Sequence, residues 1–181
     1  MDTDIRQGRI WVLLDAAGRI IEDIDTDQIF HNAHLAITDL KLMGQHAFGN
    51  LEGFKNFAKE ARPGDIVIAG GNFGAGSSRQ QAVDCFKSLG ISCLVCRSYG
   101  AIYKRNAINS GFPILTIKGL NVEDPAGANF IKHLDIIEVD LERSEVQHDG
   151  KVVGTLEPFS TVQMDIYEAG NIFKYCKTIK C

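Results

Sequence analysis

The sequence predicts an α/β fold built on a parallel sheet, and three observations support this. Short apolar runs typical of buried strands recur at 9–14, 65–69, 91–96 and 113–117. The segments 78–89 and 99–109 lie between such runs and are expected to be helices, each ending at a glycine. A glycine-rich turn joins the strand at 65–69 to the first of these helices. Strand, turn, helix and strand in this order form βαβ units, whose strands run parallel.

The elements before the glycine-rich turn follow from local patterns. Residues 9–14 are expected to form the first strand, and residues 19–22 a second strand after the Ala17-Gly18 turn. The polar segment 23–38 is expected to be a long loop. Residues 51–60 predict a short amphipathic helix, closed by Pro63-Gly64.

The elements after the turn also follow from local sequence patterns. The helix over 78–89 has its apolar residues on one face and ends at Gly90. Residues 135–141 alternate, and Asp149-Gly150 predicts a hairpin. Residues 160–170 predict a helix with Ser160 as N-cap, extended by 172–175. The 181 residues show no internal repeat, so a single domain over 1–181 is expected.

Composition excludes several classes of protein. The net charge of −4 comes without a basic cluster, which argues against a nucleic-acid partner. The first residues contain no apolar signal region, and no stretch reaches the roughly 18 apolar residues of a membrane helix. We therefore expect a cytoplasmic protein that does not contact a membrane.

Cysteines and histidines do not predict a metal site on this chain. Five cysteines without a secretory signal are not typical of a disulfide framework. Cys93 and Cys96 form a single C-x-x-C inside a strand, where packing in the core is favoured over a redox or metal role. An iron–sulfur cluster needs three or four thiolates, so none is expected here. The five histidines, among them His31 and His34, show no metal-ligand spacing.

The glycine-rich turn is the strongest chemical signal. Gly70–Gly76 requires unusual backbone angles or a close approach to another group, and Ser77-Ser78-Arg79 follows at the expected helix start. Backbone N–H groups at a helix N-terminus bind anions, and arginine holds a carboxylate or phosphate with two hydrogen bonds. A P-loop would need lysine where Ser77 stands, and a dinucleotide motif would need glycine at Arg79. The alternative is a tight turn that merely requires glycine.

Four ordered motifs resemble one known family. Asn72–Arg79 (NFGAGSSR) is similar to the N-[FY]-G-x-G-S-S-R-E-H-A signature of the aconitase swivel domain. Asp25–Ile29 (DTDQI) resembles the D-T-D-x-I segment of small dehydratase subunits, and Arg62–Gly70 (RPGDIVIAG) their K-P-G-D-I-I-V-A-G strand. Ser98–Gly111 is similar to their S-F-A-x-I-F-Y-R-N-A-I-N-x-G. The resemblance covers about residues 8–175.

This resemblance implies a fold and an activity. The fold would be a three-layer β/β/α swivelling domain with a mixed sheet. The chain would be the small subunit of a hydro-lyase that isomerises a hydroxy-diacid by dehydration and rehydration. A large subunit would carry a [4Fe–4S] cluster, whose Lewis acidity helps the hydroxyl leave. The small subunit would bind no cofactor itself.

The resemblance also implies roles for individual residues. Ser77 would be the catalytic base, acting as an alkoxide stabilised by backbone N–H groups, the helix dipole and Arg79. Ser78 and Arg79 would hold a substrate carboxylate, and Asp27 would orient a histidine or a water of the large subunit. Thr26 and Asn72 complete the expected substrate-binding set. On its spacing alone, Asp27 is equally compatible with a solvated acidic turn.

Two departures from the family pattern affect this interpretation. Gln80-Gln81 stands where the family usually has Glu-His, which removes a titratable pair. The expected specificity loop contains His34, Leu35, Ile37 and Thr38, without the arginine of some homoaconitate-type subunits. An apolar loop fits an alkyl group better than a third carboxylate, which favours isopropylmalate, or a related alkyl-substituted malate, over homoaconitate. Homoaconitate and a dimethylmalate are the alternative substrates. A non-catalytic binding module with the same fold is the alternative, favoured by Gln80-Gln81.

Overall fold

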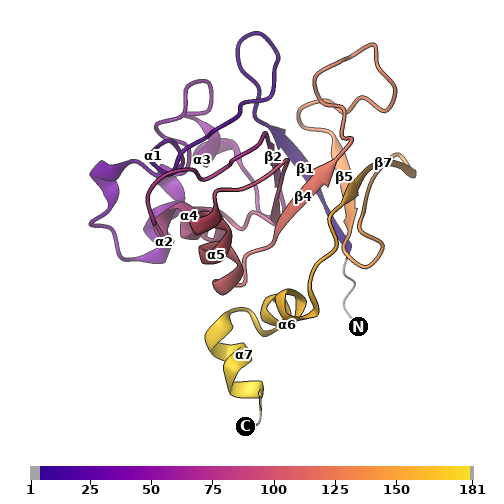
Figure 1. The fold of residues 1–181 in the computed structure, drawn as a ribbon. Coiled ribbons are helices and arrows are strands. Elements are labelled where there is room, and N and C mark those ends of the chain that lie inside the picture. Colours follow the sequence, from indigo (N-terminus) through magenta and orange to yellow (C-terminus); the bar gives the residue numbers. More distant parts are fainter. Residues whose placement is uncertain (1–4, 180–181) are drawn as a thin grey trace.

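A closed barrel of seven strands forms the centre of the computed structural model, which describes residues 5–179 (Figure 1). The strands follow one another around the barrel in the order β1-β2-β3-β4-β7-β6-β5. Their bounds are β1 (Ile5–Val12), β2 (Ile66–Ala69), β3 (Cys93–Cys96), β4 (Ile114–Lys118), β5 (Ile136–Asp140), β6 (Glu145–His148) and β7 (Lys151–Leu156).

One half of the barrel is parallel and the other antiparallel. β1 to β4 pair in parallel, with Ile10 opposite Ile66 and Ile66 opposite Cys93. β5, β6 and β7 pair antiparallel. The halves meet where the first five residues of β1 pair with β5, and where Ile117 of β4 pairs with Leu156 of β7. The predicted α/β fold with a mixed sheet is confirmed, but these two junctions close the sheet into a barrel where separate layers were expected.

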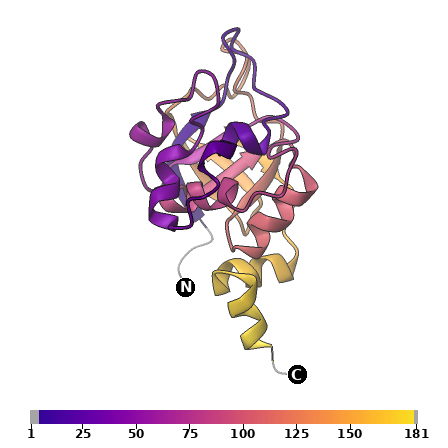
Figure 2. The ribbon, with the colours of Figure 1, turned by 90° about the vertical axis from the view of Figure 1, so that its left-hand side faces the viewer.

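Short helices cover the outer face of the parallel half, while the last two project beyond the barrel (Figures 1 and 2). The α-helices are α1 (Thr26–Ile29), α2 (Leu40–Met43), α3 (Phe57–Glu60), α4 (Gln81–Leu89), α5 (Ala101–Asn109), α6 (Thr161–Ala169) and α7 (Ile172–Thr178), and the 3-10 helices are η1 (Asn32–His34) and η2 (Gly44–His46). No helix within residues 5–179 is long and apolar enough to cross a membrane.

β2 and β3 are buried on both faces along their whole length, which explains their continuous apolar runs. Ile66 and Ile68 face the barrel interior, whereas Val67 and Ala69 face the helices. Cys93 likewise lies in the interior and Cys96 on the helix side, both fully buried. Burial raises the pKa of each of these thiols to about 12, so the expected packing role of the C-x-x-C is confirmed.

Four expected elements differ from the structure. Residues 19–22 contribute only an isolated bridge between Leu14 and Ile20, and the helix expected over 51–60 is confined to α3. The segment 23–38 is not a plain loop, because Asp25 and Gln28 form a capping box that starts α1. α4 begins at Gln81, three residues later than expected.

The C-terminal hairpin and helix are confirmed, but residues 172–175 belong to a separate helix, α7, and do not extend α6. Asp149 and Gly150 both have positive φ, as the two-residue hairpin between β6 and β7 requires. Ser160 Oγ accepts a hydrogen bond from the N–H of Gln163 (3.2 Å) and caps α6.

Candidate active site

The glycine-rich turn follows β2 and has a shape that only glycine permits at key positions. Gly74 has a φ of 76°, and a Cβ there would lie 2.2 Å from Cγ of Tyr103. Gly76 has a φ of 94°. Any side chain at Gly74 would therefore meet both backbone strain and a buried ring. The turn is a built feature of the fold and not a flexible link.

Two other segments hold this turn between them. The N–H of Gly74 donates to the carbonyl of Ile24 (2.7 Å), and that of Thr26 donates to the carbonyl of Ala75 (2.9 Å). On the other side, the N–H of Gly100 donates to the carbonyl of Phe73 (2.9 Å). The three motifs at 25–29, 72–79 and 98–111 thus meet at the carboxyl edge of the parallel strands, where α/β proteins commonly place their sites.

Ser77 and Ser78 lie exposed at the end of the turn. Ser78 Oγ accepts a hydrogen bond from Asn106 Nδ2 of α5 (3.3 Å). Within residues 5–179, Ser77 Oγ has no hydrogen-bond partner, so its hydroxyl is free to meet a ligand. Because α4 begins only at Gln81, Ser77 lies outside the first helical turn, where the helix dipole is weaker than expected.

Arg79 and Asp27 form an ion pair beside the two serines. Arg79 Nη1 lies 2.8 Å from Asp27 Oδ1 and also donates to the carbonyls of Phe30 (2.7 Å) and Thr26 (3.3 Å). The Arg79 side chain is 12% exposed. Its Nε and Nη2 groups form no hydrogen bond within the described part of the chain. Arg79 therefore secures α1 through one nitrogen and keeps donors for a carboxylate.

Asp27 is held as a carboxylate. The hydrogen bond from Arg79, supported by the N–H of Asn32 (2.9 Å), holds the pKa of Asp27 below its usual range against the opposing effect of partial burial. Its Oδ2 accepts from Asn50 Nδ2 (3.1 Å) and lies 3.8 Å from His31 Nε2. The side chain keeps 33% exposure. A charged, partly open acid therefore lies next to Arg79.

Thr26 and Asn72 have structural contacts of their own. Thr26 is buried (3% exposed) and uses its backbone to bind the turn and Arg79. Asn72 adopts a positive φ of 53°, and its Nδ2 donates to Asp23 Oδ1 (2.8 Å). Their expected contact with substrate stays a prediction.

The expected specificity loop lies next to Asp27, on η1 and the residues after it. The ring of His34 stacks on His46, with centroids 3.8 Å apart. Leu35 is 38% exposed, Ile37 packs against the helix-side core, and Thr38 is exposed. Burial, with a smaller effect of His34, lowers the pKa of His46.

The two glutamines that depart from the family pattern both have partners. Gln80 Nε2 donates to Asp84 Oδ1 (3.0 Å) and Ser110 Oγ (2.8 Å). Gln81 Nε2 donates to the carbonyl of Leu35 (3.3 Å) and so ties the specificity loop to α4. A glutamate in place of Gln80 would face the carboxylate of Asp84.

Sequence reasoning missed three supporting residues: Asn50, His46 and Asn106. Asn106 belongs to the motif at 98–111, so the motif itself contained the signal for its role. Asn50 and His46 lie in a segment without a recognisable pattern, and only the fold brings them to Asp27 and His34.

The described residues contain no group of three or more histidine, cysteine or acidic side chains placed to bind a metal. Cys85, Cys93 and Cys96 are fully buried. Burial raises their pKa, which disfavours the thiolate form that an iron–sulfur cluster requires. These three thiols therefore do not suit a cluster.

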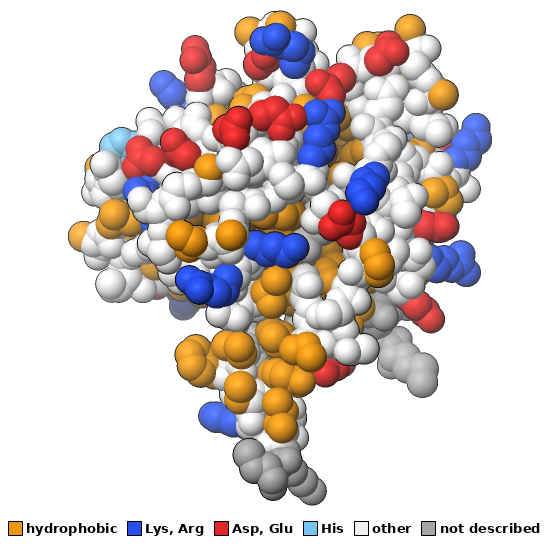
Figure 3. All heavy atoms as spheres, in the orientation of Figure 1, with side chains coloured by type: hydrophobic (Ala, Val, Ile, Leu, Met, Phe, Trp, Pro, Cys, Tyr) orange, Lys and Arg blue, Asp and Glu red, His pale blue; other side chains and the backbone are white. Residues whose placement is uncertain are grey.

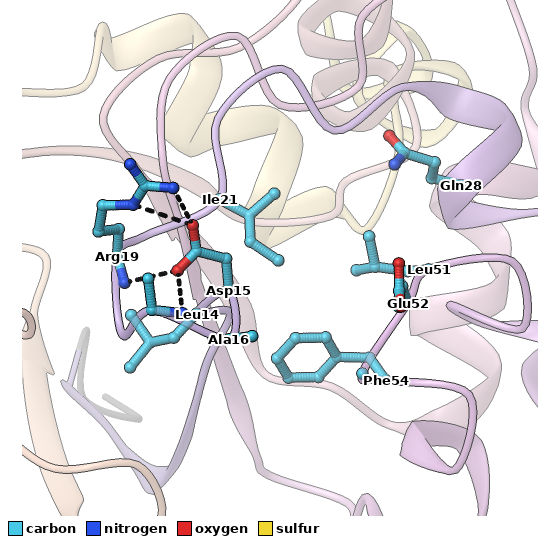
Figure 4. A pocket seen from close by; sticks show the side chains of 11 residues that line it. Leu14, Asp15, Ala16, Arg19, Ile21, Gln28, Leu51, Glu52 and Phe54 are labelled. Atoms are coloured by element: carbon cyan, nitrogen blue, oxygen red, sulfur yellow. Dashed lines mark hydrogen bonds and ion pairs between the residues drawn. The ribbon is translucent and has the colours of Figure 1, made fainter.

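A hollow of the described surface lies beside the site. A groove of about 770 Å³ runs between the loop that follows β1 and the segment 51–54 (Figure 4). Figure 4 shows Arg19 paired with Asp15 on one side, and Leu51, Phe54 and Gln28 on the other. Gln28 Oε1 already accepts from the N–H of Asp25 (2.9 Å). The groove is lined by no serine, threonine, cysteine, histidine or lysine, so the site at Ser77 is the stronger candidate.

Comparisons with known proteins find relatives over most of the chain. The family model described as "Aconitase C-terminal domain" matches residues 50–120, which include the whole glycine-rich turn. The chain is 36% identical to a 3-isopropylmalate dehydratase small subunit of Aquifex aeolicus, covering 94% of each chain. It is 33% identical to a methanogen homoaconitase small subunit of Methanocaldococcus jannaschii, covering 93% of this chain and 94% of the relative.

A solved structure is also similar to this chain over most of its length. The fold is similar to a crystal structure of 3-isopropylmalate dehydratase from Methanocaldococcus jannaschii, with a TM-score of 0.78 and 32% sequence identity. The match covers 96% of this chain and 93% of that chain.

Proposed function

Because the chain belongs to the family of small subunits of aconitase-type dehydratases, we propose that it is the small subunit of a two-subunit hydro-lyase. The reaction is the isomerisation of a hydroxy-diacid by dehydration and rehydration, and 3-isopropylmalate/2-isopropylmalate is the proposed substrate pair. The enzyme would act in the cytoplasm, in leucine biosynthesis. The observation that supports this best is the exposed Ser77 hydroxyl beside the Arg79–Asp27 pair.

The residues of this chain account for binding and proton transfer. Arg79 holds a substrate carboxylate through its free N–H groups, with the Ser78 hydroxyl beside it. Thr26 and Asn72 complete the proposed substrate-binding set. Ser77 Oγ takes the proton from the carbon next to that carboxylate while the hydroxyl leaves the adjacent carbon, which gives an alkene. Return of the proton and hydroxyl to exchanged carbons completes the isomerisation.

A large subunit supplies what this chain lacks. Its [4Fe–4S] cluster provides the Lewis acidity that helps the substrate hydroxyl leave. Asp27, one-third exposed, orients a histidine or a water of that subunit. Ser77 has no base or cation in contact within the described residues, so its activation requires the closed complex.

The substrate proposal depends on the specificity loop. Leu35 and Ile37 present apolar surface beside Asp27, and the loop contains no arginine for a third carboxylate. An alkyl side chain would be buried there at little cost, whereas an unpaired carboxylate would be penalised. Homoaconitate and dimethylmalate are the alternative substrates.

An anaerobic assay with the co-purified large subunit tests this function. Isopropylmalate, homoaconitate and dimethylmalate are compared, each with the small subunit alone, the large subunit alone and both together. Turnover of isopropylmalate that requires both chains is the expected result. Turnover of homoaconitate but not of isopropylmalate would make homoaconitate the substrate in place of isopropylmalate. Absence of turnover with every substrate would favour the non-catalytic binding module.

A further inference from the structure

The last helix, α7, presents an apolar surface that no residue within 5–179 covers. None of its residues Ile172–Thr178 is buried, and Phe173 is 79% exposed. Val162 of α6 (52%) and Ile179 (51%) add to this surface. Figure 3 shows the hydrophobic side chains gathered over α6 and α7, in the region that projects from the barrel. A contiguous apolar patch of this kind marks an interaction site.

The patch has a fixed position on the fold. Ile166 of α6 is buried, and the Tyr167 hydroxyl accepts a hydrogen bond from the N–H of Ile114 at the start of β4 (3.3 Å). The backbones of Gly111 and Gly170 approach so closely that a Cβ on Gly111 would lie 2.3 Å from the carbonyl oxygen of Gly170. α6 is thus anchored to the barrel and to the end of α5, and it holds α7 in place.

A groove connects the patch to the candidate active site. It has a volume of about 450 Å³ and runs between α4, α5 and α7, where its lining includes Gln80, Asn106, Asn109, Ile172 and Phe173. Asn106, on one wall, donates to Ser78 Oγ. One continuous surface therefore extends from the exposed serines, along α5, to Phe173.

We propose that this α5–α7 surface is the docking site of the large subunit, with Phe173 as its apolar anchor. The proposal rests on the function proposed above, because Ser77 and Ser78 are incomplete until another chain covers them. A chain that covers the serines from the α5 side passes over the groove and reaches Phe173. The rim of this surface is charged, with Lys174 and Lys177 on α7 and the exposed Asp165 and Glu168 on α6.

A second copy of this chain fits the surface less well. A two-fold contact would set the same patch against itself. Such a contact would occupy the groove that leads to Ser78 and hinder access of the large subunit.

The test uses the full chain with Phe173→Asp, and Phe173→Ala as the milder change. Calorimetric titration with the large subunit is expected to show a Kd raised by about tenfold or more for Phe173→Asp, as at an aromatic hot spot. At saturating large subunit, turnover stays within about twofold of wild type, because Phe173 does not touch the substrate. The matched control is Ile136→Asp on β5, 60% exposed, for which the Kd is expected to be unchanged.

Two results would overturn the proposal. One is an unchanged Kd for Phe173→Asp. The other is a wild-type dimer in light scattering that Phe173→Asp dissociates without weakening large-subunit binding, which would make a second copy the occupant. Because binding is measured directly, it separates this inference from the proposed function: a complex that forms through Phe173 but turns over no substrate supports the docking site and contradicts the activity.

Discussion

Two arginine–aspartate pairs lie at opposite edges of the parallel sheet. Asp65, just before β2, binds Arg9 through Nε (3.1 Å) and Nη2 (2.6 Å) and also accepts from Trp11 Nε1 (2.8 Å). Its side chain is 4% exposed. Asp27, at the carboxyl edge, binds a single nitrogen of Arg79 and keeps 33% exposure. At the amino edge the fold buries the Asp65 carboxylate and supplies its hydrogen bonds. At the carboxyl edge Asp27 stays partly exposed, and Arg79 keeps N–H groups that a ligand can bind.

The difference in burial indicates that the Arg9–Asp65 ion pair is structural, whereas the Arg79–Asp27 ion pair is available for function. Removing one partner of a buried pair leaves an uncompensated polar group, which is costly. Removing the charge of Asp27, which is one-third exposed, costs less stability, because water can reach its place and Arg79 keeps the carbonyls of Phe30 and Thr26. The two aspartates should therefore respond to the same substitution in opposite ways.

The largest expected effect is on stability. Asp65→Asn should lower the free energy of unfolding by about 3 kcal/mol, because Arg9 loses its counter-charge and a buried amide cannot accept all the hydrogen bonds that the Asp65 carboxylate accepts from Arg9, Trp11 and the N–H of Arg62. Asp27→Asn should lower it by less than about 1 kcal/mol. Urea denaturation of both variants measures this, and equal losses would contradict the distinction.

The reverse order is expected for activity. Asp27→Asn should lower kcat of the complex about 10²-fold, because Arg79 and the partner group near Asp27 lose their orientation. Asp65→Asn, assayed where it is fully folded, should stay within about twofold of wild type. Steady-state kinetics at saturating large subunit measure kcat of both variants. A kcat of Asp27→Asn near that of wild type would show that Asp27 has no role in catalysis.

The sequence predicts the parallel half of the fold better than its closure. Strands such as 65–69 are buried on both faces, so their apolar runs are recognisable locally. The junction of β4 with β7 is a long-range pairing, for which no local pattern exists. α1 lies in a polar segment and is too short to show an apolar period, so the Asp25–Gln28 capping box is its main sequence signal.

The same limit applies to the site. The motif at 72–79 located Ser77, Ser78 and Arg79, but not the direction of their side chains. The fold turns Arg79 toward Asp27, 52 residues earlier, and places Asn106 against Ser78. Pairings of this kind depend on the packing of three segments, which spacing within one segment does not encode.

A smaller effect is expected from a change of pH on the stability of the specificity loop, at the carboxyl edge of the parallel strands. Since the pKa of His46 is lowered in the folded chain, the stability it contributes is complete above its ordinary pKa of 6.5 and declines as pH falls below it. Between about pH 7 and 5, stacking of His34 on His46 should weaken. Exchange of the Ile37 amide, which is bonded to the His34 carbonyl, should then accelerate. His46→Gln should remove this pH dependence, and its persistence would assign it to another group.

The smallest effect concerns the substrate. Leu35→Arg adds a cation to the specificity loop and should shift the ratio of kcat/KM for homoaconitate over isopropylmalate by about tenfold toward homoaconitate. Leu42→Arg is the matched control, because Leu42 is also exposed (50%) but lies on α2. An equal shift for both variants would point to a general charge effect.

The central claim is that Ser77 carries the proton in this reaction. The most direct measurement is kcat of the Ser77→Ala complex, with Ser92→Ala, at the opposite edge of the sheet, as the control. The account predicts a loss of about 10³-fold or more for Ser77→Ala with unchanged affinity for the large subunit, and kcat near wild type for Ser92→Ala. Turnover by Ser77→Ala within about tenfold of wild type would contradict it and place the base on the large subunit.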